Sequence, residues 1–68
     1  MSIKLNFAKK VYYGRMAKNL TQEELAEKVS VSPRWLQRIE KGAVPSGEVT
    51  LKLISTLELD CRNIEEEN

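Results

Sequence analysis

Four long polar side chains fall on one face of a short predicted helix in the middle of this 68-residue chain. They recur at positions i, i+3, i+4 and i+7, whereas Leu36 and Ile39 form an apolar stripe on the opposite side. All four donate hydrogen bonds, and arginine does so through a planar fork that matches paired acceptors. A packed core does not need such groups. The face therefore predicts a binding surface, formed by Arg34, Gln37, Arg38 and Lys41.

The helix that carries this face has its own start and stop signals. Ser32 is a residue type that caps helices, and Pro33 suits the first helical position. Gly42 readily adopts the left-handed conformation that commonly ends a helix. These signals predict a helix of about nine residues that ends near Lys41, since helices of this kind stop just before such a glycine.

A second short helix is predicted just before it. Thr21 and Glu24 have the spacing of a capping box, which starts the helix at Gln22. Leu25 and Val29 then face inward, and the helix stops at Ser30 because start signals recur immediately afterwards. Residues 22–41 are therefore two short helices joined by a tight turn.

Three further helices complete the predicted architecture, which is all-α with five short helices. The first covers residues 3–18 and stops near Asn19, a residue type that tolerates the left-handed conformation. Ser46 can cap a fourth helix and Asp60 a short fifth. Apolar residues of the fourth recur at helical spacing, namely Leu53, Ile54 and Leu57.

The size and composition of the chain exclude several classes of protein. Residues 1–68 are expected to form one domain, with a core over about 6–64 and a frayed C-terminal tail. No apolar run is long enough for a membrane span or a secretory signal, so we expect a soluble cytoplasmic protein. With one cysteine, Cys61, and no histidine, neither an internal disulfide, a metal site, a cofactor nor enzymatic activity is expected.

The net charge of +1 conceals two opposed halves. Residues 1–41 hold nine Lys and Arg against four Glu, whereas residues 42–68 hold two basic against six acidic residues. Positive potential concentrated on one part of a domain attracts phosphate. Ordinary solvated helix faces would give the same counts, so the asymmetry supports a nucleic-acid partner only together with the helix face.

The arrangement resembles the DNA-binding domains of phage repressors and Cro proteins, the large xenobiotic-response-element-type family of bacterial regulators. The resemblance covers roughly residues 7–64, and its most specific stretch is NLTQEELAEKVSVSP followed by RIEKG. It implies a lambda-repressor-like fold in which the third helix enters the major groove of double-stranded DNA. By position, the base-contacting residues are then Arg34, Gln37 and Arg38, and the two arginines imply guanines in the half-site.

The same resemblance implies a set of phosphate contacts and one structural ion pair. The phosphate-contacting residues would be Thr21, Gln22, Ser32 and Lys41. For Thr21 a capping role is equally compatible with the sequence, because one hydroxyl can do both. Arg15 and Glu40 match positions that commonly pair in the family and tie the first helix to the third.

Three aromatic residues have two possible roles each. Trp35 either covers the core, from a position four residues before Ile39, or stacks on the sugar-phosphate backbone. Tyr12 and Tyr13 either pack partly buried against neighbouring helices or donate a hydroxyl to phosphate. We expect core packing for Trp35 and partial burial against neighbouring helices for Tyr12 and Tyr13, since these are the commoner outcomes.

Two positions depart from the family pattern. Gly14 stands where an aliphatic residue is usual, and we expect Trp35 or Met16 to fill the space. Ser30 occupies a turn position usually given to glycine, so either serine accepts a left-handed conformation or the turn differs. The loop GAVPSG after the third helix also lacks the basic residues that relatives often place there.

The predicted function is that of a small transcriptional regulator, most simply a repressor, at the bacterial nucleoid. Because so small a domain reads few base pairs, we expect a homodimer on a pseudo-palindromic operator, without a small-molecule effector. Leu59, Cys61 and Ile64 are candidates for the dimer contact or, equally, for closing the core. The alternative is a protein-interaction module, such as an antitoxin or coactivator-like adaptor.

Overall fold

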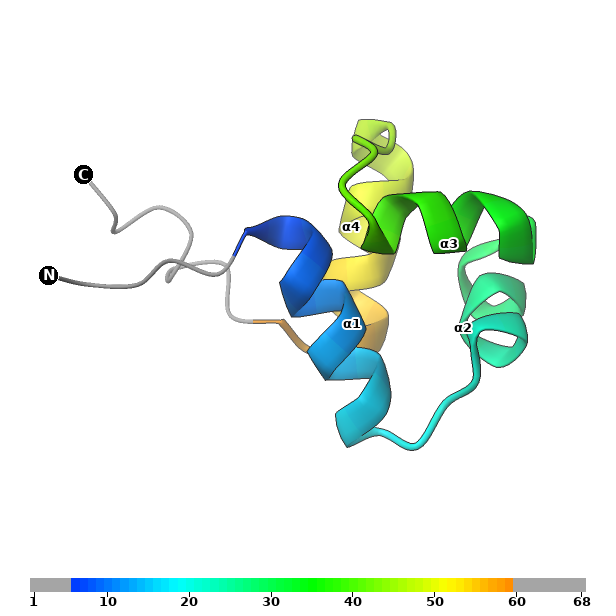
Figure 1. Cartoon of the computed structure of the whole chain (residues 1–68), viewed down its shortest axis with the longest axis vertical. Helices are drawn as coiled ribbons and strands as arrows, with labels where there is room; N and C mark the ends of the chain where they lie inside the picture. The colour runs from blue at the N-terminus through cyan, green and yellow to red at the C-terminus, as the bar shows by residue number, and fades with distance from the viewer. Residues whose placement is uncertain (1–5, 60–68) are drawn as a thin grey trace, which may run out of the picture.

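A computed structural model describes residues 6–59, which form four α-helices (Figure 1). Helix α1 spans Phe7–Ala17, α2 Gln22–Val29, α3 Pro33–Glu40 and α4 Gly47–Leu57. In Figure 1, α3 lies in the plane of the view, α2 is seen nearly end-on below one end of it, and α4 lies behind α1. None of the four described helices is long and apolar enough to cross a lipid bilayer.

The all-α class is confirmed for the described residues. The start of the first helix and the number of helices do not match the prediction. The first helix starts at Phe7 and not at residue 3, because Asn6 is its N-cap, with an extended backbone and a side chain that accepts a hydrogen bond from the Lys9 amide at 2.9 Å. The fifth helix, expected from Asp60, lies outside the described residues, so the five-helix count is not matched.

Helix α2 begins where its capping box predicts. The Glu24 amide donates to Thr21 Oγ1 at 3.0 Å, and the Thr21 amide donates to Glu24 Oε1 at 2.8 Å. The helix ends at Val29, and Ser30 follows in the left-handed conformation with φ of 63° and ψ of 43°. Of the two expectations for Ser30, the structure therefore shows a serine that accepts the left-handed conformation.

Ser30→Gly is expected to stabilise the domain by about 1 kcal/mol, because serine is strained in the left-handed conformation whereas glycine is not. Urea unfolding followed by Trp35 fluorescence measures the change. A matched control is Ser55→Gly, at an exposed position inside α4, where the same substitution should destabilise by about 0.5 kcal/mol. Equal effects at the two positions would contradict a strained turn at Ser30.

Helix α3 also has the predicted ends. Ser32 Oγ accepts a hydrogen bond from the Trp35 amide at 3.0 Å, and Pro33 occupies the first turn. Gly42 follows the C-cap residue Lys41 with a φ of +119°. The helix has eight residues, close to the predicted length, and turns its apolar stripe onto the other helices.

All four helices contribute to one buried core. Its central side chains are fully or almost fully buried, and they are Val11, Leu25, Ala26, Val29, Leu36, Ile39, Leu53 and Leu57. Trp35 is partly buried and packs against this cluster, which confirms the core interpretation for that residue. Buried residues of both α2 and α3 therefore fix the relative position of the two helices and of the turn between them.

The space beside Gly14 is filled by residues other than those predicted. A Cβ atom added at Gly14 would lie 2.9 Å from Leu59 Cδ2 and 3.4 Å from Leu57 Cβ. Met16, one of the two expected fillers, is 51% exposed, so that expectation was wrong. Glycine allows the end of α4 to approach α1 closely, and Leu59 packs against the core at this point.

Candidate nucleic-acid interface

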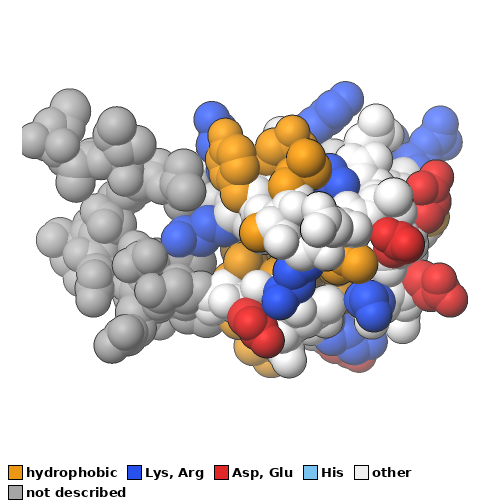
Figure 2. Space-filling view, turned by 90° about the horizontal axis from the view of Figure 1, so that it is seen from below, with side chains coloured by type: hydrophobic (Ala, Val, Ile, Leu, Met, Phe, Trp, Pro, Cys, Tyr) orange, Lys and Arg blue, Asp and Glu red, His pale blue; other side chains and the backbone are white. Residues whose placement is uncertain are grey.

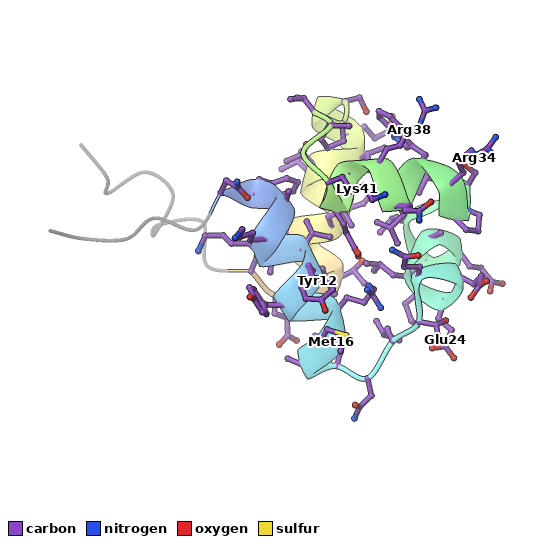
Figure 3. All side chains as sticks on the ribbon, viewed as in Figure 1. Tyr12, Met16, Glu24, Arg34, Arg38 and Lys41 are labelled. Atoms are coloured by element: carbon purple, nitrogen blue, oxygen red, sulfur yellow. The ribbon has the colours of Figure 1, made fainter. Side chains whose placement is uncertain are left out.

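The polar face of α3 is exposed to solvent. Leu36 and Ile39 are completely buried on the inner side of the helix, which turns the opposite side outward. The exposed residues on that side are Arg34, Gln37, Arg38 and Lys41. Figure 3 shows Arg34 and Arg38 pointing away from the body of the molecule. The structure therefore places the four predicted side chains together on one accessible surface, which we call the α3 face.

A shallow groove borders the α3 face near the start of the helix. It is lined by Ser32, Arg34, Trp35 and Arg38. Trp35 supplies an aromatic wall and the two arginines supply positive charge. Such a combination suits a partner with both planar apolar surfaces and negatively charged groups.

Two hydroxyl groups lie at the N-termini of α2 and α3. Thr21 and Ser32 are exposed, and each side-chain oxygen accepts a backbone hydrogen bond as a helix cap. A hydroxyl that accepts in this way still has its own proton to donate. Capping and an outward contact to phosphate are therefore chemically compatible at both residues.

Gln22 is held more tightly than its position at the start of α2 suggests. Its side chain is partly buried, and its Nε2 donates a hydrogen bond to Glu40 Oε1 at 3.1 Å. This bond connects the first residue of α2 to the last residue of α3. Because the two residues are 18 positions apart on different helices, no periodicity in the sequence indicates the contact.

Arg15 and Glu40 form a two-pronged ion pair between α1 and α3. Arg15 Nε donates to Glu40 Oε2 at 2.6 Å, and Arg15 Nη2 donates to Glu40 Oε1 at 3.2 Å. The side chains are only 10% and 5% exposed. Arg15 Nη1 also donates to the Leu20 carbonyl at 2.9 Å, which ties the loop before α2 to the same group.

The surroundings of Arg15 keep its guanidinium protonated. The hydrogen bond to Glu40 is the main cause of a raised pKa for Arg15; burial opposes it, and the negative charge of Glu40 adds to it. With a raised pKa, the stabilisation by this group is present throughout the ordinary pH range and is lost only as the pH rises through the folded-state value. Arg15 is thus a permanent structural cation.

Tyr12 and Tyr13 are more exposed than expected. Tyr12 is 39% and Tyr13 is 54% exposed. The Tyr12 ring lies over the Arg15 guanidinium, with 5.5 Å from Cζ to the ring centroid, and meets Tyr13 edge-on at 5.2 Å. Tyr12 therefore covers one side of the Arg15 and Glu40 pair. Neither ring belongs to the buried core.

Negative charge gathers on another part of the surface. Glu23, Glu24 and Glu27 of α2 are all exposed. In Figure 2 most of the acidic side chains in view lie at the end of the molecule where Figure 1 places α2. Because carboxylates repel phosphate, this outer side of α2 is unsuited to nucleic acid. The α3 face, by contrast, is basic and carries no acidic side chain on its exposed positions.

The exposed basic helix α3 follows the capped helix α2 after a tight turn, and the two share a buried core. This arrangement defines a helix-turn-helix protein. The model of the helix-turn-helix family, Cro/C1 type, matches residues 11–62 of the chain. The chain therefore belongs to this family of DNA-binding regulators. No curated protein matches the chain.

Proposed function

We propose that the protein is a sequence-specific regulator that inserts α3 into the major groove of double-stranded DNA and represses transcription where it binds. The observation that carries the proposal is the uncompensated charge of Arg34 and Arg38. Within residues 6–59 neither arginine forms an ion pair, and both are exposed on α3. An α-helix with its side chains is about 10–12 Å wide and fits a major groove of about 12 Å.

The α3 face supplies the donors that base edges require. Each arginine fork matches the O6 and N7 acceptors of guanine, and Gln37 can donate to and accept from adenine. We therefore propose that Arg34, Gln37 and Arg38 contact bases. These contacts would select a half-site that contains guanines.

The phosphate contacts are proposed for the residues that border this face. Thr21 and Ser32 offer hydroxyl protons, and Gln22 offers an amide at the start of α2. Lys41 is the C-cap residue of α3, and it is exposed seven positions after Arg34, which is a spacing of about two helical turns. Such contacts set the register of the protein on DNA without reading its sequence.

Lys41→Ala is expected to weaken binding to all duplexes alike, because a phosphate contact carries no sequence information. The slope of log affinity against log salt should fall by about 1 per bound copy. Titrations of one operator and one scrambled duplex at several salt concentrations measure both effects. A loss confined to the operator would instead assign Lys41 to base recognition.

Two copies are proposed to bind one pseudo-palindromic operator, with half-site centres about 34–36 Å apart. Of the three residues considered for a dimer contact, Leu59 packs against Gly14 and the core of its own chain. That contact favours core closure for Leu59. Cys61 and Ile64 lie outside the described residues.

Selection from randomised duplex DNA tests the proposed function directly. The expected result is enrichment of an inverted repeat with guanines in each half-site. Failure to enrich any motif would favour the second candidate, a protein-interaction module. The exposed Tyr13 and Met16 on α1, at 54% and 51%, favour that candidate, since such residues commonly anchor protein contacts. It predicts retention of a protein partner that added salt does not displace.

A further inference from the structure

The Glu40 carboxylate is the meeting point of three donated hydrogen bonds. Two come from Arg15, at 2.6 Å and 3.2 Å, and the third comes from Gln22 Nε2 at 3.1 Å. The Glu40 side chain is 5% exposed, so water competes little for these bonds. One carboxylate thus joins α1, the start of α2 and the end of α3.

An ionised carboxylate fixes which way the Gln22 amide points. It only accepts hydrogen bonds, so the amide must turn its NH2 group, and not its oxygen, toward Glu40. The NH2 group has two N–H bonds, and one of them donates a hydrogen bond to Glu40 Oε1. The second N–H then points in a direction set by the first, because the amide is planar.

We propose that Glu40 is a positioning residue that orients the Gln22 amide so that its second N–H meets a DNA backbone phosphate. The inference rests on the proposed function, and it assigns to Glu40 a part in recognition beyond its ion pair. Orientation before binding reduces the side-chain entropy lost on contact with DNA. It also prevents the amide from presenting its oxygen, which would repel a phosphate.

Arg15 neutralises the negative charge that Glu40 would otherwise place near a DNA phosphate. An unpaired Glu40 would repel a nearby phosphate, whereas the two-pronged pairing with Arg15 cancels its charge. The Tyr12 ring lies over the guanidinium and shields the pair on one side. Glu40 can therefore orient Gln22 without repelling the DNA, because Arg15 neutralises its charge.

Side-chain amide dynamics test the orientation in the free protein. The chain has two glutamines: Gln22, held by Glu40, and Gln37, exposed on α3. In ¹⁵N relaxation the Gln22 amide should be nearly as ordered as the backbone, while Gln37 serves as the mobile internal control. On addition of operator DNA, one of the two Gln22 amide protons should shift strongly. Equal mobility of the two glutamines would overturn the inference.

A double-mutant cycle tests the link to DNA binding, with the operator obtained by selection as the probe. Gln22→Met keeps the side-chain length without donors and should weaken binding by up to about tenfold. Glu40→Gln removes the fixed acceptor and should weaken binding similarly in the parent protein, but hardly at all when Gln22 is already Met. Equal losses in both backgrounds would overturn the inference and leave Glu40 purely structural.

Loss of the proposed DNA-binding function and loss of the positioning role of Glu40 would give different results. If the unmodified protein enriches and binds no duplex, the proposed function fails, whatever the dynamics of Gln22. If it binds DNA while the cycle shows no coupling, only the positioning role fails. Should Glu40→Gln not fold, the relaxation measurement and Gln22→Met decide the inference, because a mobile Gln22 amide or unchanged binding by Gln22→Met contradicts it.

Discussion

Arg34→Ala combined with Arg38→Ala is expected to remove the sequence-selective part of DNA binding while the domain stays folded. Each two-pronged arginine contact to guanine contributes about 1–3 kcal/mol of discrimination, so the double substitution should cost about 2–6 kcal/mol. That loss corresponds to a decrease in affinity of about 30-fold or more. The fold should survive because both side chains are exposed and the buried side of α3 is unchanged.

Fluorescence anisotropy with an operator and a scrambled duplex measures this loss, and circular dichroism checks the helix content. The matched control is Lys28→Ala combined with Lys52→Ala. It also removes two positive charges, but from α2 and α4, where Lys52 pairs with Glu48. The control should retain the ratio of operator to scrambled binding. If the arginine variant retained that ratio too, base recognition by Arg34 and Arg38 would be refuted.

Glu40→Ala should have the largest effect on stability, a loss of about 3–5 kcal/mol in the free energy of unfolding. The substitution leaves the Arg15 guanidinium buried, with the Leu20 carbonyl as its remaining hydrogen-bond partner among the described residues. It also removes the acceptor of Gln22. For a domain of this size, such a loss approaches the whole stability.

Urea unfolding followed by the fluorescence of Trp35, the single tryptophan, measures this change. Replacing both charges, with Arg15→Met and Glu40→Leu, should recover most of the loss, because no charge is then left buried. Such recovery would separate the cost of a stranded cation from the loss of packing. If Glu40→Ala lowered the free energy of unfolding by less than about 1 kcal/mol, the Arg15 and Glu40 pair would contribute no more than an exposed ion pair does. Water would then solvate Arg15 in the variant.

The helix ends were the most predictable part of the fold, because their signals are local. Thr21 with Glu24, and Ser32 with Pro33, each act within a few residues of the helix start, and the structure has both caps in place. The start of α1 was the exception. Asn6 caps that helix, but it lies in a run of helix-compatible residues, and the prediction overlooked it.

Contacts between helices were much less predictable, because they depend on how the helices pack. The Gln22 bond to Glu40 and the approach of Leu59 to Gly14 have no local signature. The pairing of Arg15 with Glu40 was expected from the family resemblance, since position on a helix indicates only which residues face inward. The roles of the α3 face in reading DNA remain predictions that rest on residue chemistry.

Three of the four described helices are followed by a residue other than glycine with a positive φ, namely Asn19, Ser30 and Glu58. Asparagine tolerates this conformation, whereas Ser30 and Glu58 are strained in it. Glycine relieves the strain at both, but Glu58→Gly also removes the carboxylate that pairs with Lys18 at 3.4 Å. The protein thus has a reserve of stability that natural variation can draw on. If Arg34 and Gln37 read bases as proposed, a substitution at either residue that weakens the fold can be offset by glycine at such a turn, because the turn residues lie outside the α3 face.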